Sequence, residues 1–230
     1  MGSTEHSGVG QGLKRAVIFL GAPGAGKGTQ AKEVARAYQV PHLSTGDMFR
    51  DHVGRGTELG GMAKPIMERG ELVPDQIVLG MVQERIARPD CAYRFIFDGF
   101  PRTLPQAEKL DLMLQEAGFG RPLVVHIAVG YDRLFRRLTG RRTCSVGGEI
   151  YNIYDRPPKV PGRCDNDGGE LVHRADDRED VIRERLAAYE RQTKPLLDYY
   201  RAQGVLVDVD GTAEPEVVTR SVLEILARSE

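Results

Sequence analysis

The sequence contains no tryptophan, few aromatic residues, only three cysteines and no long hydrophobic run. The cysteines, Cys91, Cys144 and Cys164, are too few and too odd in number for a disulfide framework, and they suit a reducing compartment. The start of the chain has no apolar stretch typical of a signal peptide, and no later stretch approaches the length of a membrane span. We therefore predict a cytoplasmic protein with no membrane partner.

Net charge is almost absent too, because 32 Lys and Arg residues stand against 33 Asp and Glu residues. A nearly neutral chain gives no reason to expect a nucleic-acid partner, so any anion-binding site has to be local. With 230 residues, 40% of them hydrophobic, the chain can bury one sizeable core. We expect residues 1–15, rich in Gly and Ser, to be a disordered leader or tag, and residues 16–230 to form one core with insertions.

Short apolar runs alternate with helical patterns along the chain. They lie at residues 16–20, 40–43, 93–97, 123–129 and 205–209. This alternation predicts an α/β fold, a parallel sheet with helices on both faces. Residues 44–73, charged and interrupted by glycines, predict a small helical insertion. Residues 140–177, dense in Gly, Pro, Asp and aromatic residues, are either a disordered loop or a small β lid; the apolar residues within them favour the lid.

Residues 21–29, GAPGAGKGT, follow the first apolar run and open a helical pattern, which is the context required of the G-x-x-x-x-G-K phosphate loop. Glycines let successive N–H groups turn inward around an anion, and Lys27 supplies a mobile cation. A tight structural turn is the alternative, but it explains neither the lysine nor both flanking elements. The residue after Lys27 is Gly28 and the hydroxyl comes only at Thr29, so we expect magnesium to be held largely through water.

The buried run at 93–97 ends in the segment Asp98-Gly-Phe-Pro-Arg102. Open α/β sheets bind ligands at the carboxyl ends of their strands, so Asp98 is placed to orient magnesium-bound water. Arg102 can pair with a phosphate through its planar guanidinium. An aspartate that only caps the next turn is the alternative for Asp98. Further on, Thr103, Pro105 and Gln106 predict a helix start, with Gln106 facing the same cleft.

Two other segments carry cationic or capping residues. Thr45 can cap the helical insertion, while Arg50 points a charged donor at the cleft. Around the predicted lid, Arg133, Arg137 and Arg141 recur at helical spacing, and Arg174 and Arg185 follow it. A solvated basic face is the ordinary explanation of such a run, with Asp176, Asp177 and other acids as partners. The phosphate loop favours an anion-binding face instead.

Taken together, the segments GAPGAGKGTQ, STGDMFR, DGFPRT, RLTGR, PPK and RADD resemble the long-lid adenylate kinases of bacteria and mitochondria, from about Ala16 to the end of the chain. The resemblance implies a P-loop NTPase-like core of five parallel strands, with a nucleoside monophosphate (NMP)-binding domain at 44–73 and a lid domain at 140–177. It implies reversible phosphoryl transfer, ATP + AMP = 2 ADP, in adenine nucleotide homeostasis. The ligands would be ATP, AMP and ADP with Mg²⁺, and we expect a monomer.

The resemblance also assigns residues to each nucleotide. For ATP it implies Gly24, Ala25, Gly26, Lys27, Gly28, Thr29, Arg137, Arg141, Ile150, Tyr151 and Ala213, with the backbone of Gly211. For AMP it implies Thr45, Arg50, Glu71, Leu72, Val73, Gly99, Phe100, Pro101, Arg102, Gln106, Arg174 and Arg185. The catalytic cations would be Lys27, Arg102, Arg137, Arg174 and Arg185.

A phosphate acceptor is already an anionic nucleophile, so the reaction needs alignment and charge neutralisation but no general base. Closure of the two insertions would exclude water from the cleft. Two rival classes remain: another small-molecule kinase or switch GTPase, which would need motifs that we do not find, and an interaction module built on an incomplete zinc ribbon.

Some members of this family bind structural zinc in the lid through two C-x-x-C or C-x-x-D pairs. Here the corresponding segments run from Cys144 to Gly147 and from Cys164 to Asp167. Gly147 has no side chain to donate, and structural zinc normally takes four protein ligands. A site at Cys144, Cys164 and Asp167, completed by water or His173, is the alternative, and we favour a lid without metal.

Overall fold

The structure, a computed structural model, describes residues 14–229. Most of the predicted leader thus lies outside the described residues, and Arg15 already belongs to the first strand. The strands are β1 (Arg15–Leu20), β2 (His42–Ser44), β3 (Arg94–Asp98), β4 (Leu123–Ala128), β5 (Arg141–Cys144), β6 (Ile150–Asn152), β7 (Leu171–Val172) and β8 (Leu206–Asp210).

The α-helices are α1 (Lys27–Tyr38), α2 (Thr45–Gly54), α3 (Glu58–Glu68), α4 (Asp75–Ile86), α5 (Leu104–Glu116), α6 (Tyr131–Gly140), α7 (Glu179–Ala188), α8 (Pro195–Ala202) and α9 (Pro215–Ala227). Short 3₁₀ turns lie at η1 (Pro89–Cys91) and η2 (Ala175–Asp177), and a π-helical turn, η3 (Tyr189–Thr193), joins α7 to α8.

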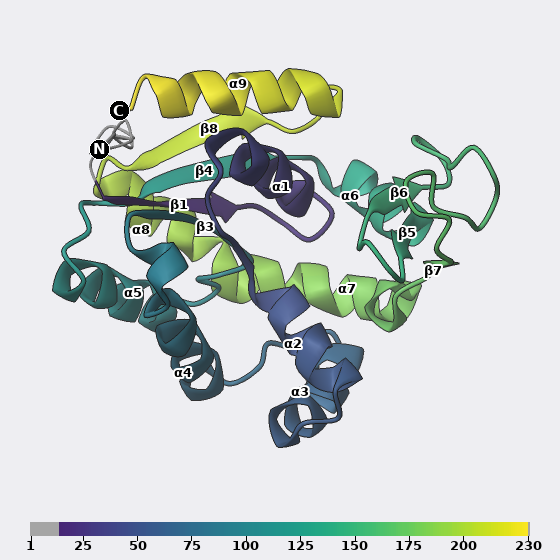
Figure 1. The fold of residues 1–230 in the computed structure, drawn as a ribbon, viewed down its shortest axis with the longest axis horizontal. Helices are drawn as coiled ribbons and strands as arrows, with labels where there is room; N and C mark the ends of the chain where they lie inside the picture. Colours follow the sequence, from purple (N-terminus) through teal and green to yellow (C-terminus); the bar gives the residue numbers. More distant parts are fainter. Residues whose placement is uncertain (1–13, 230) are drawn as a thin grey trace, which may run out of the picture.

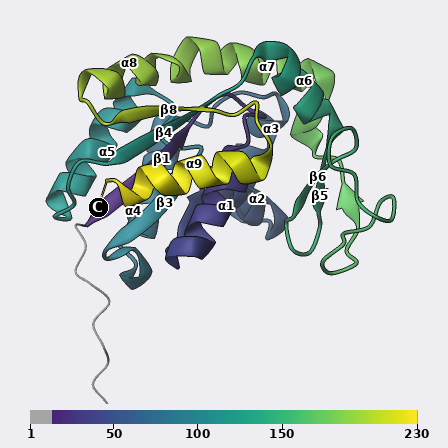
Figure 2. The same cartoon turned by 90° about the horizontal axis from the view of Figure 1, so that it is seen from above.

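The main sheet has five parallel strands in the order β2-β3-β1-β4-β8. Helices cover both of its faces (Figures 1 and 2), so the α/β prediction is confirmed. Strand limits differ from the predicted ones by a residue or two. The run at 40–43 shifts to His42–Ser44 because the N–H of Val40 bonds back to the carbonyl of Ala35 and so belongs to the end of α1.

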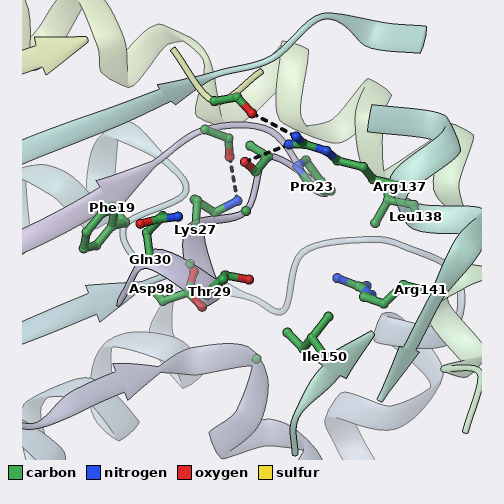
Figure 3. Close-up of a pocket in the computed structure, with 18 of the residues that line it drawn as sticks. Phe19, Pro23, Lys27, Thr29, Gln30, Asp98, Arg137, Leu138, Arg141 and Ile150 are labelled. Carbon is green, nitrogen blue, oxygen red and sulfur yellow. Dashed lines mark hydrogen bonds between the residues drawn. The ribbon is translucent and has the colours of Figure 1, made fainter. Parts of the chain in front are cut away.

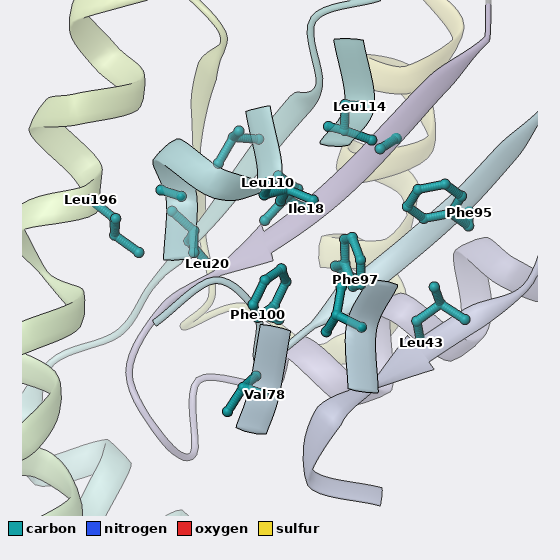
Figure 4. Close-up of a cluster of buried hydrophobic side chains, with 14 of the residues drawn as sticks. Ile18, Leu20, Leu43, Val78, Phe95, Phe97, Phe100, Leu110, Leu114 and Leu196 are labelled. Carbon is teal, nitrogen blue, oxygen red and sulfur yellow. The ribbon is translucent and has the colours of Figure 1, made fainter. Parts of the chain in front are cut away.

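Two hydrophobic layers sandwich the sheet, because successive strand residues point to opposite faces. Ile18 and Leu20 of β1 join Phe97 and side chains of α4, α5 and α8 in one layer, which Figure 4 shows. Val17 and Phe19 join side chains of α1, α6, α7 and α9 in the other layer. Each face therefore anchors helices whose ends meet at the carboxyl edge of the strands.

Two groups of elements project from this core in Figure 1: helices α2 and α3, and a separate small sheet, β5–β7. The small sheet is antiparallel, in the order β6-β5-β7, and four side chains form its own buried cluster: Cys144, Tyr151, Cys164 and Leu171. Helix α7 leads from the small sheet back beneath the main one (Figure 1). Both groups thus sit beside the edge where the strands end.

Candidate active site

The phosphate loop, residues 21–26, connects β1 to α1 as the sequence predicts. Gly26 is the N-cap of α1 with φ = 101°, a left-handed conformation that favours glycine. A side chain at Gly21 would place its Cβ 2.6 Å from the carbonyl oxygen of Ile127, so only glycine fits there. The loop therefore depends on glycine at these two positions, and its residues Gly21, Gly24, Ala25 and Gly26 line the cavity beside it.

Lys27 lies across this loop, and its Nζ donates hydrogen bonds to the carbonyl of Gly21 at 2.8 Å and to that of Ala22 at 3.0 Å. Figure 3 shows Lys27 beside the loop. Burial lowers the pKa of Lys27 to about 8; the nearby Asp98 opposes the shift, and the charges of Arg102 and other arginines add to it. The ammonium group is thus held in place among like charges, where an anion would stabilise it.

Asp98 ends β3 directly beside the start of α1. Burial alone would raise its pKa, but the contacts with His42 and Lys27 outweigh burial and lower the pKa of this carboxyl. A Cβ at Gly28 would lie only 3.0 Å from Oδ2 of Asp98. A serine or threonine side chain at position 28 would therefore crowd this carboxylate.

A cavity of about 900 Å³ opens between the loop, the strand ends and the small sheet. The predicted donor-site residues that line it are Gly24, Ala25, Gly26, Lys27, Gly28, Thr29, Arg137, Arg141, Ile150, Tyr151, Gly211 and Ala213. Arg137 donates to the carbonyls of Gly211, at 2.9 Å, and Ala25, at 3.4 Å (Figure 3). It therefore links α6 to the loop and to the turn after β8.

The predicted face of Arg133, Arg137 and Arg141 does not exist as one helical stripe. Helix α6 ends at Gly140, where a Cβ would clash with Asn152 and Tyr154, and Arg141 begins β5. All three arginines nonetheless line the same cavity. Arg141, at the start of the following strand, pairs with Asp177 of η2.

Arg141 and Arg185 share one buried carboxylate. Asp177, 1% exposed, accepts from Nε of Arg141 at 2.7 Å and from Nη1 of Arg185 at 2.9 Å. Asp176 pairs with Arg185 as well, at 3.0 Å. Burial alone would lower the pKa of Arg141, but Asp177 outweighs it and raises the pKa. For Arg185, burial lowers the pKa in spite of Asp176.

Arg102 and Arg174 have no such carboxylate within ion-pair distance among residues 14–229. Nε of Arg102 donates to the carbonyl of Gly99 at 2.8 Å, and Nε of Arg174 donates to Oγ1 of Thr143 at 2.9 Å. Burial, followed by like-charged neighbours, lowers the pKa of both groups. Both line the cavity, so their remaining N–H groups are available to an anionic ligand.

A second, small cavity of about 50 Å³ adjoins the large one between α2, α4 and α5. Its lining includes these predicted acceptor-site residues: Thr45, Glu71, Leu72, Val73, Gly99, Arg102 and Gln106. Arg50, Pro101, Arg174 and Arg185 line the large cavity. Arg50 is paired there with Asp47.

One acceptor-side prediction, the cap of α2, needs correction. Ser44, not Thr45, caps α2: its hydroxyl accepts from the N–H of Asp47, while Thr45 is helical and donates to the carbonyl of Gly99 at 2.9 Å. Phe100 lines neither cavity; its side chain is buried in the core against Phe97, with 5.2 Å between ring centroids. The predicted helix start is confirmed: α5 begins at Leu104, and Thr103 caps it by accepting from the N–H of Gln106.

Sequence reasoning missed several residues around these cavities. His42 faces Asp98 at 3.7 Å, Lys32 donates to the carbonyl of Gly148 at 2.9 Å, and Asp75 contacts Gln106. For His42, the available signal was its position as a polar residue two positions before Ser44, at the end of a predicted strand. Lys32 and Asp75 meet partners far along the chain, so no local pattern marked them.

The small sheet holds the one group of three metal-type donors found among the described residues: Cys144, Cys164 and Asp167, whose ligand atoms all lie within 4.8 Å of one another. His173 is not part of it. Sγ of Cys144 donates to Asp167 at 3.2 Å, and a Cβ at Gly147 would lie 2.6 Å from Oδ2 of Asp167. The carboxylate thus fills the space beside Gly147.

None of the helices described in residues 14–229 is long and apolar enough to cross a membrane.

Comparison with known proteins gives one consistent result. The family model described as "Adenylate kinase" matches residues 19–205. The chain is 52% identical over 212 residues to an adenylate kinase of Thermodesulfovibrio yellowstonii, covering 92% of this chain and 99% of that protein. It is 51% identical to an adenylate kinase of Archaeoglobus fulgidus, covering 92% and 98%, and 50% identical to one of Lysinibacillus sphaericus, covering 85% and 90%.

Proposed function

The chain belongs to the adenylate kinase family, phosphotransferases that interconvert ATP and AMP with two ADP, and we propose how the residues of its two cavities divide this reaction. The observation that carries the proposal is the gathering of cationic side chains around one cavity, among them Lys27, Arg102, Arg137, Arg141, Arg174 and Arg185. Two nucleotides bring several negative charges to one place, and such a set of cations suits them.

We propose that ATP binds along the phosphate loop. The amides of Gly24 to Thr29 and Nζ of Lys27 would hold its phosphates, since the loop lies at the N-terminus of α1 and a helix N-terminus favours anions. Ile150, Tyr151 and Arg137 would complete the site from the small sheet and α6, and the turn at Gly211 and Ala213 would contact the base.

AMP is proposed to bind in the smaller cavity. Thr45, Val73 and Gln106 would surround the base, with Leu72 and the backbone of Glu71 and Gly99 beside them. Arg50 and Arg102 would hold the phosphate at the opening into the larger cavity. This arrangement directs the acceptor phosphate at the end of the donor triphosphate.

Transfer then depends on charge stabilisation and alignment. The acceptor oxygen is already anionic, so no base has to remove a proton from it. Lys27, Arg102, Arg137, Arg174 and Arg185 would neutralise the charge that spreads over the transferred group. Arg141 and Arg185 form ion pairs with Asp177, and we propose that some of these contacts are replaced by contacts with phosphate oxygens when the nucleotides bind.

Adenylate kinases use Mg²⁺ with ATP. Oxygen donors suit this ion, and the ionised Asp98 beside Thr29 fits an arrangement in which water bridges protein and metal. When bound, the ion offsets phosphate charge. The role of Asp98 itself would be to orient that water by accepting its hydrogen bonds.

We further propose that residues 44–73 act as the NMP-binding domain and residues 140–177 as a lid that closes over the donor. The Lys32 to Gly148 hydrogen bond supports closure onto α1. The lid is proposed to need no zinc, since the hydrogen bond from Cys144 to Asp167 already joins its two turns, and the N–H of Gly169 holds the Asp167 carboxylate within the second turn. A monomer in the cytoplasm is proposed as well.

A coupled assay of ADP formation from Mg-ATP, with AMP, GMP, CMP and UMP as acceptors in turn, tests the function. AMP should be used far better than the others. The site assignment is tested by Arg102→Ala beside Arg36→Ala, an exposed arginine on α1 paired with Glu33. Strong loss only in the first variant is expected; equal activities would contradict the assignment.

A further inference from the structure

The side-chain amide of Gln106 is held at both ends. The residue is 1% exposed, its Oε1 accepts from the backbone N–H of Arg102 at 2.8 Å, and its Nε2 donates to Oδ1 of Asp75 at 2.7 Å. The remaining N–H and the second lone pair of Oε1 are left for whatever enters the small cavity that Gln106 lines.

Asp75 is the first residue of α4 and joins it to the start of α5. Its other oxygen, Oδ2, accepts from Oγ1 of Thr103, the cap of α5, at 2.9 Å. Helices α4 and α5 pack against each other (Figure 1), so this carboxylate is fixed from two sides. An ionised carboxylate only accepts hydrogen bonds, and it therefore dictates which end of the Gln106 amide faces it.

A flipped amide would be penalised twice. Oε1 would face the carboxylate oxygen of Asp75, and Nε2 would face the N–H of Arg102. Both pairs would be repulsive, and the buried polar groups would lose their partners. The amide thus offers its N–H and its C=O to the cavity in a single order.

That order matters because the two purines present opposite patterns. On its pairing edge adenine offers an acceptor at N1 beside the amino donor at N6, whereas guanine offers an N1–H donor beside the O6 acceptor. A glutamine that can turn over its amide can pair with either base. A glutamine with a fixed amide can match only one of them.

We propose that Asp75 is a positioning residue that locks the amide of Gln106 and so makes the acceptor site select adenine over guanine. The proposal rests on the proposed placement of the acceptor base beside Gln106. To that acceptor site the present proposal adds Asp75, a residue that does not touch the nucleotide and acts only through Gln106 and Thr103.

The test compares kcat/KM for AMP and for GMP, at saturating Mg-ATP, in the wild type and in Asp75→Ala. The AMP to GMP ratio should fall at least about tenfold, through a higher KM for AMP and a lower KM for GMP, with kcat for AMP nearly unchanged. Asp75→Asn should restore the ratio to within about threefold, because its oxygen can still accept from Gln106 while its amide donates to Thr103.

A merely structural role makes a different prediction. It would lower the melting temperature of Asp75→Ala and leave the AMP to GMP ratio at the wild-type value, and that result would overturn the proposal. Glu58→Ala removes a comparable acid from the first turn of α3, an exposed position that touches neither cavity, and serves as the matched control. If Asp75→Ala does not fold, Asp75→Ser replaces it, since the shorter hydroxyl does not reach Gln106.

A double variant separates this proposal from the one on which it rests. In a Gln106→Ala background, Asp75→Ala should change the AMP to GMP ratio by less than about twofold; a further tenfold loss would show that Asp75 acts by another route. If the wild type itself fails to prefer AMP, the proposed acceptor site is wrong. If it prefers AMP and Asp75→Ala keeps that preference, only the lock is wrong.

Discussion

Removal of the Asp177 carboxylate should destabilise the free protein and make it more responsive to phosphate ligands. Asp177 is buried between Arg141 of the small sheet and Arg185 of α7, and their side chains are only 14% and 17% exposed. In Asp177→Ala, Asp176 remains near Arg185 but Arg141 loses its bidentate partner. Two guanidinium groups would then face each other across the same cleft.

The magnitude follows from the geometry of the pair. Breaking a buried ion pair by removing one partner costs about 3–5 kcal/mol. Here both arginines line an open cavity and can take up water, so we expect the low end, about 3 kcal/mol. For a protein of this size each kcal/mol corresponds to roughly 2–4 °C, which gives a fall in melting temperature of about 6–12 °C.

Thermal unfolding followed by circular dichroism, with and without tripolyphosphate, measures both effects. Tripolyphosphate should raise the melting temperature of Asp177→Ala more than that of the wild type, because the freed arginines can bind its oxygens. Asp180→Ala removes an exposed acid of α7 that lies 3.6 Å from Arg178, and it should change the melting temperature by less than about 1.5 °C. This reasoning would be refuted if the melting temperature of Asp177→Ala were lower than that of the wild type by less than about 2 °C. It would also be refuted if tripolyphosphate raised the melting temperatures of the two proteins equally.

Two further predictions concern the transferred group and the small sheet. Arg102→Ala should keep the fold and lower kcat by about two to five orders of magnitude in steady-state assays, the range for lost charge stabilisation of a phosphoryl group; Arg36→Ala should be unaffected, and a folded Arg102→Ala with normal turnover would contradict the role. Protein purified without chelator should hold less than about 0.1 zinc per chain by elemental analysis, and chelation should not shift its melting temperature. Stoichiometric zinc, lost together with stability on chelation, would reverse the assignment of Cys144, Cys164 and Asp167.

The sheet and the phosphate loop could be predicted from the sequence because both depend on local patterns. Buried strands appear in the sequence as short apolar runs. The conformation of the loop requires glycine at Gly21 and Gly26, so these glycines are visible in the sequence. The cap of α5 at Thr103 is local in the same way. The predicted strand limits are wrong by a residue or two where a residue bonds to a neighbouring element. At Val40, for example, the N–H bonds to the carbonyl of Ala35 in α1, so the residue is not part of the strand.

The orientation of side chains and the identity of their partners were harder to predict from the sequence. Phe100 stands inside a motif of site residues, but its large apolar ring is more stable in the core than in a polar cavity. Helical spacing placed Arg141 on a face with Arg137, yet the helix ends before it. The partners of Arg141, Gln106 and Lys32 are 36, 31 and 116 residues away in sequence, so only the fold could identify them.

The pH dependence of ATP use tests the protonation state of Lys27 before ATP binds. Burial, with help from neighbouring arginines and against Asp98, lowers the pKa of Lys27 to about 8. Raising the pH through that value removes the cation that would hold the donor phosphates. At saturating AMP, kcat/KM for Mg-ATP should therefore be flat below pH 7.5 and fall about tenfold per pH unit above 8, because it reports groups of the enzyme before ATP binds. A bound triphosphate favours the ammonium form, so kcat should stay constant to higher pH.

In Lys27→Arg the pH at which kcat/KM begins to fall should be higher by more than one pH unit, whatever the absolute activity of the variant. A wild-type profile flat to pH 9.5, or the same midpoint in both proteins, would show that Lys27 is not the group that controls ATP binding.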